Sequence, residues 1–169
     1  MKRKHLLLRR RGQFGFRAQA MVEFAIALPV LLVLVVGVME VGRMVLTYAM
    51  VTNASRDAVR YASAVGIGDD GYDKYNNCVG IQNLAKNSAY IVALSSVTIK
   101  YYDANGNYKW DCDRTTVGED TDISVASNYS VKVTVEASYK PVVKLIPIGQ
   151  KDFSATSTRT ILGIFDLNQ

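Results

Sequence analysis

The chain has 169 residues and a formal net charge of +5, with 20 lysines and arginines against 15 aspartates and glutamates. Seven of the basic residues and none of the acidic ones precede Glu23, so residues 23–169 hold 13 basic and 15 acidic groups. The excess positive charge therefore belongs to an N-terminal leader, and the rest of the chain lacks the basic excess that binding to nucleic acid requires.

The basic leader predicts how the chain is oriented across a membrane. It contains the only histidine, His5, and it precedes an apolar run, after which both signs of charge are mixed. Because positively charged flanks stay in the cytoplasm, we expect the N-terminus inside and the chain beyond about residue 42 outside. The pattern predicts a single-pass protein of the cytoplasmic membrane with an extracytoplasmic C-terminal domain.

The apolar run, residues 24–39, contains no charged side chain. As a helix it spans about 24 Å, and the apolar residues on either side extend it toward the ~30 Å core of a bilayer. It is longer than the ~7–15 residues of a secretory signal core, and no small-residue cleavage motif follows it directly. We therefore expect a retained membrane-spanning helix in contact with the lipid bilayer.

A single carboxylate, Glu23, stands at the start of this run. An ionised acid in or near hydrocarbon costs roughly 2.5–3.5 kcal/mol even on the most lenient insertion scale. Such a residue is expected to be functional and to have a partner that neutralises it.

Helical periodicity continues past the apolar run, which predicts one helix from about residue 20 to residue 65, ended by Gly66 and Gly68. Pro29 lies within the apolar half, where it is either a tolerated kink or a hinge that lets the helix stretch during assembly. The stripe expected to face a domain is Val41, Met44, Val45, Tyr48, Val51, Ser55, Ala58, Val59, Ala62 and Val65.

Two pairs of charged residues lie on this helix. Glu40 and Arg43, three residues apart, are predicted to form a structural ion pair near the outer end of the membrane span, and a recognition site is the alternative. Arg56 and Arg60, four residues apart, are expected to contact either the sheet of the same chain or a neighbouring subunit.

The C-terminal part is large enough for one small domain if the outer half of the long helix contributes a face to its core. The hairpin signal Asn105-Gly106 lies between two runs of strand-forming residues. We predict a lollipop-shaped α+β fold, with a small antiparallel sheet packed on the long N-terminal helix. The expected elements are a helix at 79–94 and strands at 97–102, 108–110, 129–139 and 153–162.

Cys78 and Cys112 are the only cysteines, and both fall on the predicted outer side of the membrane. An even pair in an oxidising compartment favours a disulfide worth about 3–4 kcal/mol, with two free thiols as the alternative. Without histidine neighbours the pair is a poor zinc site.

The sequence gives little support for catalysis or for a metal cofactor. Asp103, Asn105, Asn107 and Asp111 alternate as calcium ligands do, but Arg114 stands where a bidentate glutamate is needed, so a hairpin is the better interpretation. No histidine, second ionisable group or glycine-rich phosphate loop is positioned to activate a nucleophile or bind a cofactor. We expect a protein without enzymatic activity or cofactors.

Four segments together resemble TadE-like pseudopilins of the tight-adherence (Flp-type IV) pilus system, over roughly residues 10–65. The "VEFAI…P" and "NA.R…RYA" parts carry most of the likeness. The segments are Arg10-Arg-Gly-Gln-Phe-Gly, Ala20-Met-Val-Glu-Phe-Ala-Ile-Ala-Leu-Pro-Val-Leu-Leu, Gly37-Val-Met-Glu-Val-Gly-Arg43 and Asn53-Ala-Ser-Arg-Asp-Ala-Val-Arg-Tyr-Ala62.

The resemblance implies a pilin-like fold and processing by a prepilin peptidase, which cuts before the apolar segment. Mapped onto this chain, the cut falls between Ala18 and Gln19 and makes Glu23 the fifth residue of the mature protein; the family prefers glycine where this chain has Ala18. The freed α-amino group of Gln19 could then pair with Glu23 of its own or a neighbouring subunit and set the stagger between packed helices.

The resemblance also implies a division of the chain and a set of partners. The expected parts are a cleaved leader at 1–18, a transmembrane and amphipathic helix at 19–65 and an extracytoplasmic domain at 66–169. The expected partners are other pilins and pseudopilins and the inner-membrane pilus assembly platform, in a role in adhesion and secretion. A signal-anchored binding or sensing module that is neither processed nor polymerised is the alternative, and a membrane-tethered enzyme is a weaker third.

Overall fold

The computed structural model describes residues 13–68, 71, 73–112, 128–143 and 149–161, with side chains from Ala18 onward. Residues 1–12 of the predicted leader lie outside this part of the chain, and its remaining residues, 13–18, form the first turns of the long N-terminal helix. The elements in chain order are α1 (Gln13–Ala62), α2 (Cys78–Ser88), β1 (Leu94–Tyr102), β2 (Tyr108–Asp111), β3 (Ser130–Tyr139) and β4 (Lys151–Thr160).

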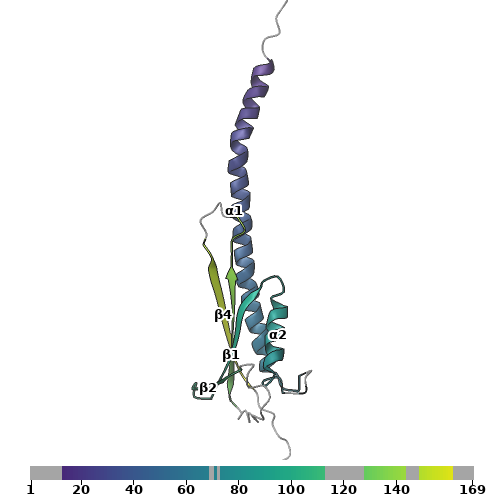
Figure 1. Ribbon diagram of the computed structural model, residues 1–169, viewed down its shortest axis with the longest axis vertical. Helices are drawn as coiled ribbons and strands as arrows, with labels where there is room; N and C mark the ends of the chain where they lie inside the picture. The colour runs from purple at the N-terminus through teal and green to yellow at the C-terminus, as the bar shows by residue number, and fades with distance from the viewer. Residues whose placement is uncertain (1–12, 69–70, 72, 113–127, 144–148, 162–169) are drawn as a thin grey trace, which may run out of the picture.

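The predicted α+β lollipop is confirmed. One 50-residue helix, α1, projects from a small domain in which its C-terminal half packs beside α2 and an antiparallel sheet (Figure 1). The sheet has the order β2-β1-β3-β4. Its two long central pairings, β1 with β3 and β3 with β4, place β3 in the middle of the sheet and β4 at one edge.

Alternation along β3 explains how the sheet meets the helix. Val131, Val133 and Val135 are fully buried, whereas the residues between them are partly or largely exposed, as expected for a strand with one face on a core. They pack against small residues of α1, including Ala54 and Ala58, which are fully buried. These small side chains let the long helix lie close to the sheet.

The face of α1 that meets the sheet differs from the predicted stripe in its first turns. Val45 was expected to face the domain but is 59% exposed, and Thr47 is buried instead. Tyr48 does meet the domain, edge-on to Phe153 of β4 with 6.1 Å between ring centroids, although it is 55% exposed. The Thr47 hydroxyl donates to the carbonyl oxygen of Arg43 at 2.9 Å, which removes the penalty for burying it. Farther along, the buried Ser55 matches the prediction and lies 2.8 Å, oxygen to oxygen, from Ser157 in β4.

Element boundaries differ most from the predictions at the start of α1, which begins at Gln13 rather than at about residue 20, and at the end of α2. The expected helix at 79–94 begins one residue earlier, at Cys78, and ends at Ser88. Asn77 caps its start by accepting from the Gly80 N–H at 2.6 Å. Asn87 and Ser88 are poor helix formers, and the chain turns after them so that β1 begins at Leu94, three residues before the predicted strand.

The turn between β1 and β2 is organised by one carboxylate. Asp103 accepts from the backbone N–H groups of Asn105 and Asn107 at 2.9 and 2.8 Å and pairs with Lys109 at 3.2 Å. Gly106 supplies the positive φ of 81° that the turn requires. The aspartate that suggested a calcium ligand is thus used in the hairpin, as the sequence interpretation preferred.

The Asp103 turn predicts a specific acid sensitivity. Hydrogen bonds, first from the Asn107 N–H, lower the pKa of Asp103 from 3.8 to about 2. A lowered pKa stabilises the fold above the ordinary pKa, and this stability is lost as the pH falls from about 4 toward 2. Asp103→Asn should therefore lower the thermal unfolding temperature at about pH 6, and the difference from wild type should shrink at about pH 2. A constant difference across this range would contradict the assignment.

Candidate functional site

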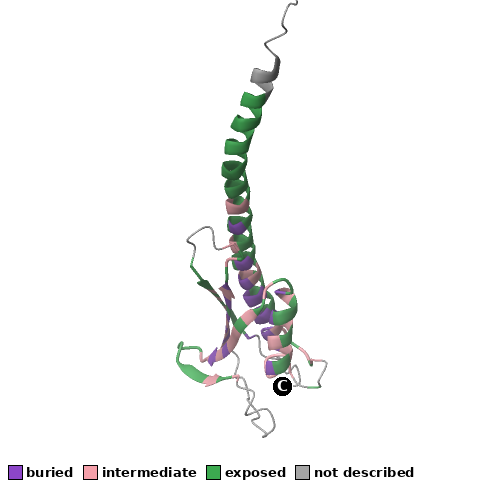
Figure 2. Cartoon of the chain, turned by 45° about the horizontal axis from the view of Figure 1, so that its top comes forward, coloured by how far each residue is buried: buried purple, intermediate pink, exposed green. Residues whose placement is uncertain are grey.

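The N-terminal half of α1 is an apolar surface that no other described residue covers. Every residue from Ala18 to Val35 is exposed, and Phe24, Ile26 and Val30 each leave about two thirds of their surface open (Figure 2). Within the described residues, α1 is the one helix long and apolar enough to cross a membrane, and none of its most apolar 18-residue window is buried. Soluble monomers rarely expose a continuous apolar patch of this size, so a lipid or protein partner must cover it.

The two residues at the predicted processing junction lie inside α1. The Gln19 side-chain amide donates to the Glu23 carboxylate at 3.2 Å, because positions four apart share one helix face. Both residues are exposed, so Glu23 has its neighbour's amide but no cation beside it among the described residues. The cut between Ala18 and Gln19 and the amine pairing of Glu23 remain predictions.

Pro29 does not interrupt the helix. α1 runs through it as one element with a gentle overall curvature (Figure 1). This geometry agrees with the interpretation of Pro29 as a tolerated residue within the apolar half, and its role as a hinge during assembly remains a prediction.

The exposed half of α1 ends at a buried carboxylate. Glu40 is only 3% exposed, and it accepts hydrogen bonds from the hydroxyl of Tyr139, from the Val142 N–H at 2.9 Å and from the Val143 N–H at 3.1 Å. The Arg43 guanidinium lies 3.1 Å from the same carboxylate. We call this arrangement the Glu40 clamp. It joins α1 to the end of β3, about 100 residues away in sequence, and leaves the buried charge fully hydrogen-bonded.

The clamp also orients the groups around it. The hydrogen bond from Tyr139 to Glu40, with burial and the nearby negative charge, raises the pKa of the tyrosine above its ordinary value, so its hydroxyl remains a donor. The Arg43 guanidinium lies over the Tyr139 ring, 5.7 Å from its centroid. The predicted Glu40–Arg43 ion pair is thus present, but sequence reasoning missed Tyr139, Val142 and Val143, which carry the contact with the domain.

Arg56 and Arg60 lie on the outer surface of α1. Both are exposed, and neither forms an ion pair with another described residue. Neither anchors the helix to the sheet through an ion pair with a described residue, and a contact with a neighbouring subunit remains a prediction.

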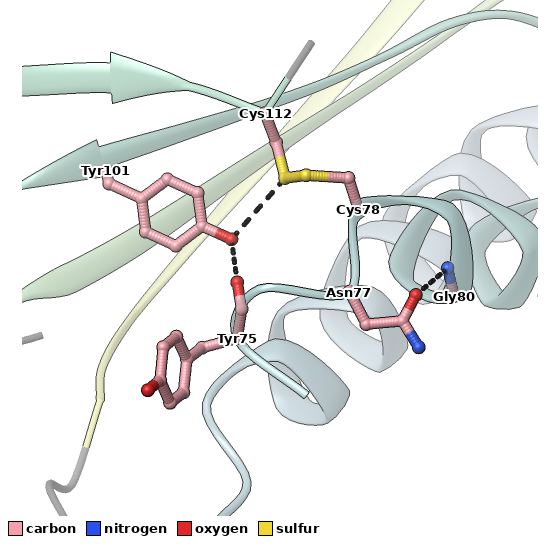
Figure 3. The surroundings of a disulfide bond; sticks show 6 residues. All are labelled: Tyr75, Asn77, Cys78, Gly80, Tyr101 and Cys112. Carbon is pink, nitrogen blue, oxygen red and sulfur yellow. Dashed lines mark hydrogen bonds between the residues drawn. A yellow bond between two sulfur atoms is a disulfide. The ribbon is translucent and has the colours of Figure 1, made fainter. Parts of the chain in front are cut away.

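The cysteines form a disulfide that ties α2 to the sheet. Cys78, the first residue of α2, is bonded to Cys112, directly after β2, with 5.6 Å between their Cα atoms (Figure 3). Beside it the buried Tyr101 hydroxyl donates to the carbonyl oxygen of Tyr75, and burial raises the pKa of this tyrosine. The bond therefore fixes α2 and the loop before it to the β1–β2 hairpin.

The described residues offer little for catalysis. No group of three or more histidine, cysteine, aspartate or glutamate side chains among them could hold a metal ion. A shallow hollow of about 330 Å³ between the end of α1 and α2 is lined by uncharged residues only, among them Tyr61, Asn83 and Asn87. This hollow supplies no acid–base pair.

The comparisons with known proteins identify the same segment of the chain. Residues 18–60 match the family model described as TadE-like protein, which confirms the resemblance over this part of the chain. The matched residues include the whole exposed apolar run and the Glu40 clamp's helical half, and they end at Arg60. The searches of curated proteins and of solved structures found no match.

The Glu40 clamp should show strong energetic coupling. Glu40→Gln and Tyr139→Phe should each destabilise the domain by about 1–3 kcal/mol, because each leaves a buried hydrogen-bonding group less well satisfied. The double variant should cost clearly less than the sum, since both changes remove the same interaction. Denaturant unfolding of the full chain in detergent measures these values, with Tyr90→Phe, at an exposed tyrosine, as the control. Additive losses would show that the two groups do not interact.

Removal of the disulfide should destabilise the domain without affecting the membrane helix. Cys78→Ser combined with Cys112→Ser should cost about 4 kcal/mol, as expected for a bond that closes a loop of 34 residues. Thermal unfolding of the oxidised protein, the reduced protein and the double variant gives the comparison. Equal stability of all three would mean that the bond contributes nothing to the fold.

Proposed function

We propose that this chain is a membrane-anchored minor pilin or pseudopilin that takes part in assembly of a tight-adherence pilus, with a structural rather than enzymatic role. The observation that carries the proposal is the coincidence of the TadE-like match at residues 18–60 with a helix whose apolar half is left uncovered by the described part of the chain. A pilus subunit uses such a helix in two ways: the helix first anchors the subunit in the membrane and later packs among the helices of other subunits.

The membrane arrangement follows from charge and exposure together. The seven basic residues before Glu23 place the N-terminus in the cytoplasm under the positive-inside rule, and the domain at 66–169 then lies outside. The disulfide supports this orientation, because such bonds persist in oxidising compartments. The leader at 1–18 is removed by a prepilin peptidase, and the helix at 19–65 remains as anchor and packing element.

The pairing of Glu23 with a freed α-amino group gives the processed helix its register. Residues 19 and 23 lie on one face, one helical turn apart, as the bond between their side chains supports. After the cut, the ammonium of Gln19 is close to its own Glu23 and exposed to the Glu23 of a neighbour. Two charges that are each costly in lipid then neutralise one another, and their attraction grows in a medium of low dielectric constant.

The surface of α1 beyond the membrane is suited to contacts with other subunits. Val41, Val45 and Tyr48 are about half exposed, and the exposed side chains of Arg56 and Arg60 follow them along the helix. An apolar strip continued by cations fits a neighbouring pilin helix better than bulk water. The inner-membrane assembly platform is the second partner that the role requires.

The test of this proposal separates insertion from assembly. Glu23→Gln should leave the protein in the membrane fraction but reduce its co-purification with other pilus components at least tenfold, because the ammonium loses its counterion. Glu136→Gln, which neutralises an exposed carboxylate on the sheet, is the matched control and should assemble normally.

The intact mass of the protein extracted from membranes tests the cut directly. The proposal predicts a mature chain that begins at Gln19. A full-length chain in assembled pili, or normal assembly of Glu23→Gln, would contradict it. Full-length protein that is found only outside pili would favour a signal-anchored binding or sensing module.

A further inference from the structure

The end of β3 is held at the level where the apolar half of α1 ends. Met39 is the last residue of the uncharged run, and the next residue, Glu40, binds the N–H groups of Val142 and Val143. Figure 1 shows β3 ending, and β4 beginning, at the end of the sheet that faces the exposed half of α1. The twenty residues from Ala20 to Met39 span about 30 Å as a helix, which equals the thickness of a bilayer core. With α1 anchored as proposed, this geometry brings residues 140–143 to the level of the membrane surface.

The chemistry of this segment fits a lipid interface. Val142 is 71% exposed and is flanked by the half-buried Pro141 and Val143. Two exposed lysines lie close to it: Lys140 directly after β3, and Lys151 at the start of β4, which pairs across the sheet with Tyr139. Apolar side chains between lysines are typical of segments that lie in the interface, where the ammonium groups reach lipid phosphates.

The Glu40 clamp removes the main cost of placing this backbone against lipid. A polar main-chain group that loses water without gaining a partner costs several kcal/mol in hydrocarbon. Proline at 141 has no N–H, and the N–H groups of Val142 and Val143 both donate to Glu40. The segment can therefore approach the acyl region with these donors satisfied.

We propose that residues 140–143, together with Lys151, form a second membrane contact, in which Val142 enters the boundary between headgroups and acyl chains and the two lysines bind anionic lipid phosphates. The contact rests on the proposed membrane anchoring by α1, and its occupant is the outer surface of the same bilayer. With α1 it holds the domain at two points and restricts its rotation about the helix axis.

Tryptophan fluorescence in vesicles tests the contact. Val142→Trp and the control Tyr108→Trp, at the opposite end of the sheet, are reconstituted in phosphatidylglycerol vesicles with brominated acyl chains. Strand β3 separates the two positions by about 30 Å. The wild-type protein gives the emission of Trp110 alone and serves as the reference. The extra emission of Val142→Trp should be blue-shifted, and the brominated acyl chains should quench about half of it. The extra emission of Tyr108→Trp should not be quenched. Equal quenching of both would overturn the contact.

Two further measurements separate the possible failures. Lys140→Gln with Lys151→Gln should roughly halve the quenching of Val142→Trp in phosphatidylglycerol and leave it unchanged in phosphatidylcholine. The same quenching with and without the lysines would overturn their assignment to phosphates. Flotation of each sample with the vesicles reports anchoring by α1. Floating protein without quenching would refute the second contact alone, and failure to float would refute the membrane anchor as well.

Discussion

The burial of the Glu40 carboxylate is the interaction on which the rest of the structure depends. A buried ionised group without partners would cost several kcal/mol, so Glu40 can be buried only when its four hydrogen-bond donors are in place. Those donors come from its own helix, from the last residue of β3 and from the main chain after it. This requirement fixes both the rotation of α1 and its position along the sheet.

The clamp also divides one continuous helix into two parts that suit different surroundings. On its N-terminal side the surface is apolar and open, and on its C-terminal side Val51, Ala54 and Ala58 are fully buried against the sheet. Since the helix has no break between the parts, a force on the membrane half is transmitted directly to the domain. The disulfide reinforces the far side of the same domain, where α2 and the β1–β2 hairpin meet.

The sequence predicts the elements with a strong local signal and misses the contacts between distant ones. The uncharged run at 24–39, the alternating valines of β3 and the two cysteines each carry their own pattern, and the structure agrees with all three. Nothing local marks the N–H of Val142 as the partner of a carboxylate 102 residues away. The apolar stripe likewise suggested Val45 for the core, because a threonine whose hydroxyl bonds its own helix is not recognisable as a core residue from sequence. The cut after Ala18 and the pairing of Glu23 come from family resemblance and membrane physics, and both remain predictions about the processed form that the proposal requires.

The most direct test of this account measures hydrogen exchange along α1 in the full chain. The rates in lipid nanodiscs are compared with those in a mild detergent in which only the domain stays folded. The account predicts that the exchange rates of the backbone amides change at Met39 and Glu40. Amides before Met39 should exchange slowly in nanodiscs and faster in detergent, whereas amides in the segment that contains Val51 and Ala58 should exchange slowly in both. Rapid exchange throughout residues 24–39 in nanodiscs would contradict the claim that this half of the helix belongs in lipid.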